Sequence, residues 1–123
     1  MIGQWQSLII DCPTPRALAS FYEQLLGVER LEDSPNWVTI GGAGHPTVAF
    51  QGTADFVPPR WGSPAAPQQM HMDVLVADLD IAQVQVLALG GRLLEGSDKP
   101  IGYRVYADPV GHPFCLVTPE SLV

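Results

Sequence analysis

The sequence repeats one pattern of secondary structure, and this repeat constrains its fold more than any other feature. The tripeptide Gly-His-Pro occurs at residues 44–46 and again at 111–113, at an offset of 67. Two glycines that follow helical patterns, Gly27 and Gly90, lie at an offset of 63. Self-similarity at a nearly constant spacing is typical of an internal duplication. We therefore expect two copies of one structural unit.

The first copy begins with a short apolar strand at residues 7–11, which ends at the turn signal of "DCPTP". Pro15 suits the first turn of a helix, with Thr14 as its N-cap. Gly27 provides the C-terminal stop of this helix. Strands are expected at residues 28–33, 36–42 and 46–52. The apolar face of the helix is formed by Leu18, Phe21, Tyr22, Leu25 and Leu26, at helical spacing.

The second copy follows the same order. A strand in "HMDVLVADLD" leads into a helix that Asp78 or Asp80 caps and that the glycine pair 90–91 ends. Further strands are expected in "RLLEG", "YRVYAD" and "FCLVTP". The apolar face expected for this helix consists of Ile81, Val84, Leu87 and Ala88.

The order β-α-β-β-β, stated twice, predicts an α+β fold built from two βαβββ modules. With 123 residues the chain has the length of a single domain. We expect module one at residues 5–52, a Pro- and Gly-rich linker at 53–69, and module two at 70–119. Both copies of Gly-His-Pro then mark hairpin turns, so His45 and His112 are interpreted as turn residues and not as metal ligands.

Charge and composition exclude several classes of partner. The net charge is −7 and Lys99 is the only lysine, so neither nucleic acid nor an anionic membrane is an expected partner. No apolar run approaches the ~20 residues needed to cross a bilayer, and the N-terminus lacks a signal-peptide pattern. Cys12 and Cys115 do not form a disulfide framework, so a cytoplasmic location is the default expectation.

Three segments resemble the vicinal oxygen chelate superfamily, which includes glyoxalase I, bleomycin-resistance proteins and extradiol dioxygenases. They are "DCPTPRALASFYEQLLG", "HMDVLVADLD" and "ADPVGHPFCLV", and the resemblance extends over about residues 5–118. It is closest to small glyoxalase-like proteins. The resemblance implies curved mixed sheets that enclose a cavity, and it implies a homodimer. A fold of this kind hosts many functions, so activity does not follow from it.

In metal-dependent relatives, ligands lie on the first and fourth strands of each module. Transferred to this chain, those positions are Ser7, Val48, His71 and Cys115. Only His71 is a good ligand for zinc or nickel, so we expect no metal and no cofactor. Asp73 lies two residues from His71 on the same strand face, which makes a His/Asp/Cys cluster geometrically feasible.

Strand alternation predicts which side chains face the cavity. If Ala107 pairs with His112, then Arg104 pairs with Cys115, and Arg104 and Tyr106 share the face of Cys115. Trp61 in the linker either covers the cavity or only pins the linker. The predicted lining comprises Ser7, Ile9, Trp37, Thr39, Phe50, His71, Asp73, Arg104, Tyr106 and Cys115.

Two functions agree with this lining. The first is metal-independent binding of a small organic molecule, aromatic or cationic, of the kind found in bleomycin-resistance proteins. The second is a lyase, an isomerase or a dioxygenase-like enzyme that uses His71, with Asp73 as its partner in acid–base chemistry, and has an unusual metal site or none.

Overall fold

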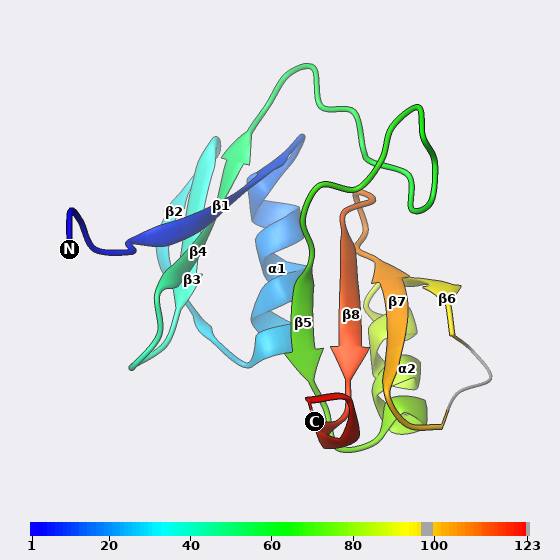
Figure 1. Ribbon diagram of the computed structural model, residues 1–123. Coiled ribbons are helices and arrows are strands. Elements are labelled where there is room, and N and C mark those ends of the chain that lie inside the picture. Colours follow the sequence, from blue (N-terminus) through cyan, green and yellow to red (C-terminus); the bar gives the residue numbers. More distant parts are fainter. Residues whose placement is uncertain (97–99, 123) are drawn as a thin grey trace. The chain divides into compact units, whose positions relative to one another are not determined.

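The computed structural model describes residues 1–96 and 100–122, and the chain in it divides into two compact units, residues 1–56 and 57–123. Each unit contains one βαβββ module with a four-stranded mixed sheet (Figure 1). The predicted α+β fold and its internal duplication are confirmed. The described residues contain no helix that is long and apolar enough to cross a membrane.

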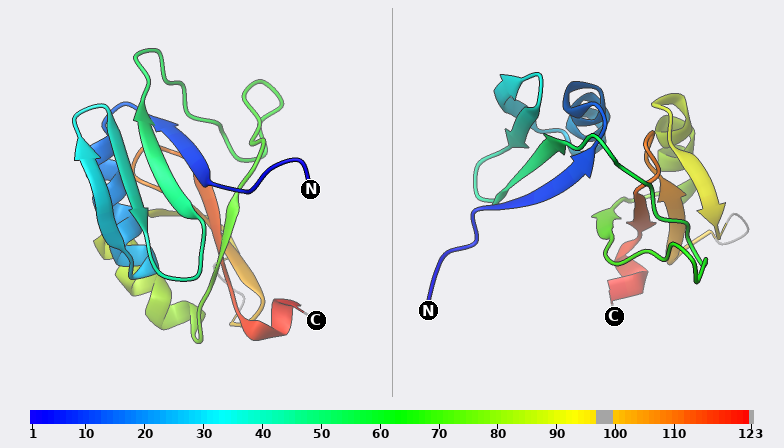
Figure 2. Two further views of the ribbon diagram at one scale, coloured as in Figure 1. Left: turned by 90° about the vertical axis from the view of Figure 1, so that its left-hand side faces the viewer. Right: turned by 90° about the horizontal axis from the view of Figure 1, so that it is seen from above.

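Module one forms a sheet with the strand order β1-β4-β3-β2. Strands β1 and β4 are parallel, whereas β3 is antiparallel to both of its neighbours. Helix α1 lies against one face of this sheet, behind the strands in the left view of Figure 2. The elements are β1 (Ser7–Cys12), α1 (Pro15–Leu26), β2 (Glu29–Ser34), β3 (Trp37–Gly41) and β4 (Thr47–Gly52).

Helix α1 has the predicted ends. Pro15 opens it, and Gly27 ends it in the left-handed conformation at φ 66°, where the lack of a side chain avoids a steric penalty. Thr14 is the N-cap residue, but its side chain makes no capping hydrogen bond. The predicted apolar face is turned to the sheet, where Leu18, Phe21 and Tyr22 are buried.

Phe50 lies on the helix side of the first sheet and not in a cavity, so its predicted position is wrong. Its ring is fully buried and stacks on Tyr22 of α1, with the two ring centroids 5.5 Å apart. Phe50 pairs with Val38 and Ile10, and side chains at paired positions share one face. The opposite face of this sheet, called here the open face of module one, carries Ser7, Ile9, Trp37 and Thr39.

Module two repeats the arrangement with the strand order β5-β8-β7-β6. Helix α2 covers one face of this sheet, behind β7 and β8 in Figure 1. The elements are β5 (Met72–Leu75), α2 (Leu79–Ala88), β6 (Arg92–Glu95), β7 (Tyr103–Ala107), β8 (Pro113–Val117) and the short 3₁₀ helix η1 (Pro119–Leu122).

The apolar face predicted for α2 is turned to the wrong side. Within α2, Leu79, Ala82 and Val86 are buried, whereas Val84 is 70% exposed and Ile81, Leu87 and Ala88 are also exposed. This helix is apolar on two sides, so its periodicity does not select one of them. The Asp78 carboxylate caps the helix by accepting a hydrogen bond from the Ile81 N–H at 2.9 Å, as predicted.

The β7–β8 register differs from the prediction by one residue. Ala107 pairs with Pro113, so Cys115 pairs with Val105, and Arg104 pairs with Leu116. Arg104 and Tyr106 therefore lie on the helix side of the sheet, and their predicted place beside Cys115 is wrong.

The turn before β8 explains the shifted register. The Asp108 carboxylate accepts hydrogen bonds of 3.0 Å from the backbone N–H groups of Val110, Gly111 and His112, and the Asp108 N–H donates to the His112 carbonyl. This network includes His112 in the turn, and Gly111 provides the positive φ of 106°. Residue 113 is consequently the first residue of the strand.

Candidate functional site

The open face of module one contains a hollow of about 570 Å³. Four of the side chains predicted to share one face lie there together, which confirms the strand alternation on β1 and β3. Ser7 and Ile9 come from β1, and Trp37 and Thr39 from β3. The remaining lining residues are Gln6, Leu31, Glu32 and Thr47.

A β-bulge places a carboxylate in this hollow. Arg30 pairs with Ile40 and Glu32 pairs with Thr39, so Leu31 is an extra residue on β2. A bulge reverses the alternation of side chains beyond it. Without it Glu32 would point to the helix side of the sheet, and with it Glu32 lies opposite Thr39 on the open face. The sequence analysis did not identify Glu32.

Glu32 is the last acceptor of a short chain of hydrogen bonds. The indole N–H of Trp37 donates to Thr39 Oγ1 at 2.9 Å, and the Thr39 hydroxyl donates to Glu32 Oε1 at 2.7 Å. Thr39 is buried, and these two bonds satisfy its hydroxyl group. The chain fixes the orientation of the Trp37 ring and of the carboxylate, so the hollow has an aromatic wall and a negative group held in place.

The metal positions transferred from the resemblance do not form a metal site in module one. Val48 has no donor atom, and it shares the helix-side face with Phe50. Ser7 lies on the open face, where its hydroxyl is hydrogen-bonded to the Thr47 hydroxyl. Neutral hydroxyl groups are poor ligands for zinc or nickel. The donor set of the fold family therefore does not fit this chain.

Three potential ligand atoms do lie together on the open face of module two, the face opposite α2. Donor atoms of His71, Asp73 and Cys115 all lie within 4.8 Å of one another. His71 Nε2 is 3.7 Å from Asp73 Oδ1, and Asp73 is the β5 partner of Cys115. An imidazole, a carboxylate and a thiol could hold a cation of intermediate softness. The feasible cluster inferred from the strand face is thus present.

The Cys115 thiol is not poised to act as a thiolate. Burial raises the pKa of Cys115 to about 11, and the charges of Asp73 and Glu95 raise it further. The thiolate is the form that binds metals and attacks electrophiles. At neutral pH Cys115 is therefore a protonated, buried side chain, and a metal bound there would first have to displace its proton.

A second carboxylate missed by the sequence analysis belongs to this face. Leu93 pairs with Tyr106 and Glu95 pairs with Val105, so Leu94 is a bulge residue in β6. Glu95 lies at the offset of 63 from Glu32, which is also the offset of the helix-ending glycines. A carboxylate at equivalent positions of both copies was the signal that could have identified these two residues.

Trp61 lies on this same face of module two. Its ring packs against the cluster of Val105, Cys115 and Val117, and its indole N–H donates a hydrogen bond of 2.9 Å to Glu95 Oε1. Its ring also meets His71 edge to face, with centroids 5.6 Å apart. Of the two roles considered for Trp61, the structure supports that of a cover.

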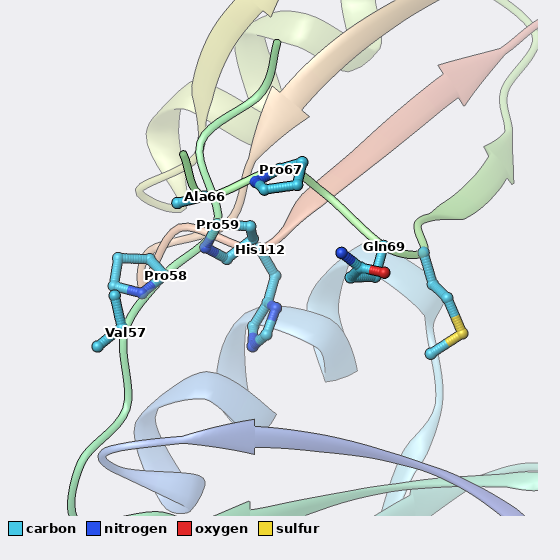
Figure 3. A pocket seen from close by; sticks show the side chains of 8 residues that line it. Val57, Pro58, Pro59, Ala66, Pro67, Gln69 and His112 are labelled. Carbon is cyan, nitrogen blue, oxygen red and sulfur yellow. The ribbon is translucent and has the colours of Figure 1, made fainter. Parts of the chain in front are cut away.

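A third hollow, of about 350 Å³, lies beside the β7–β8 turn. Figure 3 shows the His112 imidazole between Pro58 and Pro59 on one side and Gln69 on the other. His112 is thus a partly buried turn residue, while His45 is exposed. None of the residues predicted to line the cavity belongs to this hollow, whose other lining residues are Val57, Ala66, Pro67 and Met70.

With the fold and these faces described, comparison with known proteins identifies the family. The profile of the glyoxalase-like domain matches residues 7–117, so the chain belongs to the glyoxalase-like domain family. No curated protein matches the sequence.

Solved structures from this group share the fold at low sequence identity. A glyoxalase/bleomycin resistance protein/dioxygenase family enzyme from Burkholderia phytofirmans is 17% identical, with a TM-score of 0.72 over 94% of this chain and 98% of the other. A glyoxalase-related enzyme from Fulvimarina pelagi is 18% identical, with a TM-score of 0.69 over 97% and 90%. The trypanothione-dependent glyoxalase I of Leishmania major is 12% identical, with a TM-score of 0.69 over 98% and 89%.

Proposed function

We propose that this protein binds a small organic molecule without a metal ion, and that the ligand is aromatic or cationic. The observation that carries the proposal is the hollow of module one, where Trp37 and Glu32 are held by one chain of hydrogen bonds. Small-molecule sites typically combine apolar and aromatic walls with a few fixed polar groups. Bleomycin-resistance proteins provide the functional analogy within the group that the sequence resembles.

The chemistry of the hollow favours a positive charge next to a ring. Ile9 and Leu31 provide apolar walls, and Trp37 offers a ring face on which an aromatic group or a cation can lie. The Glu32 carboxylate can accept a charge-assisted hydrogen bond from an ammonium group. The net charge of −7 adds a weaker, long-range attraction for cations.

Metal independence is supported by the donor atoms available. Ser7 and Val48 occupy two of the four ligand positions implied by the family, and neither provides an imidazole or a carboxylate. The raised pKa of Cys115 keeps a third position protonated at neutral pH. Ligand recognition in module one needs none of these groups.

The experiment that tests the proposal uses 2-phenylethylammonium as a probe and phenylacetate as its anionic counterpart. In a Trp5→Phe/Trp61→Phe protein, Trp37 is the only tryptophan, and we expect its fluorescence to change with the cation and not with the anion. Trp37→Ala should weaken binding of the cation by about 1–3 kcal/mol, a typical cost of losing a buried aromatic anchor. Unchanged affinity in this variant would refute the proposed site.

An enzyme is the second candidate, and the pairing of His71 with Asp73 favours it. Their 3.7 Å separation allows the carboxylate to orient the imidazole for proton transfer. Elemental analysis of protein purified without a histidine tag separates this candidate from the first when it includes an unusual metal. Stoichiometric zinc or nickel that is lost in His71→Ala would put the enzyme ahead of the binding protein.

A further inference from the structure

The open face of module two is already occupied by a side chain of the same chain. Trp61 covers Val105, Cys115 and Val117, which are all buried, and its indole N–H donates to the Glu95 carboxylate at 2.9 Å. The third contact is the edge-to-face packing with His71. An apolar floor, a charged acceptor and an aromatic neighbour together satisfy every part of an indole ring.

The segment that carries Trp61 is held together mainly by its own hydrogen bonds. The Arg60 N–H donates to the Ala66 carbonyl at 2.6 Å, and the Gly62 N–H donates to the Gln68 side chain at 3.1 Å. Among the described residues, the bond from Trp61 to Glu95 is the one hydrogen bond that joins residues 57–69 to the strands of module two. Trp61 can therefore leave the face at the expense of few contacts, while the loop keeps its internal structure.

The groups under and around Trp61 define what else this face can bind. A flat ring would replace the indole on the apolar floor, and an N–H donor would replace its bond to Glu95. The charges of Asp73 and Glu95 both act at Cys115, where they help to raise the pKa of its thiol. This negative potential favours a protonated amine over a neutral or anionic ligand.

We propose that this face is a second binding site, specific for flat aromatic amines, and that Trp61 fills it as a displaceable internal occupant. The site lies in module two and uses none of the residues of the module one hollow, so it goes beyond the function proposed above. Trp61 is then a competitor of the ligand and not a wall of its site. Removing a competitor strengthens binding, whereas removing a wall weakens it, so the two roles predict effects of opposite sign.

The test uses tryptamine as the probe in a Trp37→Ala background, which removes the aromatic wall of module one. If the site is closed for about nine-tenths of the time, opening it by Trp61→Ala should raise the calorimetric affinity for tryptamine about tenfold. Indole-3-acetate should bind this variant much more weakly than tryptamine. Trp5→Ala, which removes a tryptophan that is 72% exposed, is the matched control and should leave the affinity unchanged.

Trp61→Phe covers the case in which the alanine variant does not fold. Phenylalanine keeps most of the apolar packing but cannot donate to Glu95, so its affinity for tryptamine should lie between those of the background protein and the alanine variant. In ¹⁵N-labelled protein that contains Trp61, unlabelled tryptamine should move the Trp61 indole N–H signal to the position of a solvent-exposed indole. Weaker tryptamine binding in the two Trp61 variants, or a Trp61 signal that stays in place at saturation, would overturn the proposal. A failure confined to these Trp61 experiments leaves the result for Trp37 and 2-phenylethylammonium untouched.

Discussion

Arg104 Nη2 donates a hydrogen bond of 2.8 Å to Asp80 Oδ1, and this contact joins strand β7 to the first turn of helix α2. Arg104 is only 2% exposed, whereas the Asp80 side chain is 80% exposed. A second bond, from Arg104 Nη1 to Gln83 Oε1, and one from the Tyr106 hydroxyl to the same oxygen complete the network. A buried guanidinium is stable here because each of these partners lies on the helix above it.

Asp80→Asn should destabilise the protein, because it leaves the buried Arg104 guanidinium without its carboxylate. We expect a loss of about 1–2 kcal/mol in the free energy of unfolding, since the exposure of Asp80 screens part of the interaction. Urea denaturation measures this value. Asp55→Asn makes the same charge change at an exposed turn of module one and should have almost no effect; equal losses in both variants would contradict the account.

The two helix N-termini should respond differently to loss of their cap residues. Asp78→Ala removes a side chain that accepts a bond from the Ile81 N–H, so it should cost about 1 kcal/mol. Thr14 makes no such bond, so Thr14→Ala should cost clearly less. Thermal unfolding of the two variants gives the comparison, and a larger loss in Thr14→Ala would show that the capping assignment is wrong.

Cys115 should make stability depend on pH in the alkaline range. The ordinary pKa of a thiol is near 9.0, and burial next to Asp73 and Glu95 raises that of Cys115 to about 11. Between these values the unfolded chain has released the proton that the folded chain retains, so stability falls as pH rises from about 9 to about 11. The full effect is on the order of 2 kcal/mol.

The control for this pH effect is Cys115→Ala, because tyrosine and lysine also titrate in the same range. The difference in unfolding free energy between wild type and this variant should shrink steadily from pH 9 to pH 11. A difference that is constant over that range would mean that the thiol has no raised pKa in the folded protein.

We also propose that the chain forms a homodimer, as the resemblance to the superfamily implies. Each of the two sheets is open, with β1 and β2 at the edges of the first and β5 and β6 at the edges of the second. Exposed edges of this kind favour pairing with another chain unless they are covered. Light scattering at micromolar concentration should give twice the mass of the 13.3 kDa chain, and the mass of one chain would refute the dimer.

The sequence predicted the order of elements because the signals were local and repeated. Pro15, Gly27 and Asp78 mark helix ends by their own conformational preferences or hydrogen bonds, so neighbouring residues were enough to place them. Strand alternation likewise placed Trp37 and Thr39 together on the open face of module one.

The errors came from features that depend on tertiary contacts. The Asp108 network lengthens the β7–β8 turn by one residue, and a register shift of one residue moves Arg104 and Tyr106 to the other face. Bulges at Leu31 and Leu94 bring Glu32 and Glu95 to the open faces, where alternation alone would not place them. Spacing patterns do not reveal such local shifts, so the two carboxylates emerged only from the strand pairing.

The most direct test of the proposed function is calorimetric titration of EDTA-treated protein with 2-phenylethylammonium, tryptamine and benzamidine, repeated after addition of zinc or nickel. We predict saturable binding of at least one of these cations to the metal-free protein, an unchanged affinity when metal is added, and a weaker affinity in both Trp37→Ala and Glu32→Gln. Binding that appears only after zinc or nickel is added, or an affinity that neither substitution alters, would contradict metal-independent recognition in the hollow of module one.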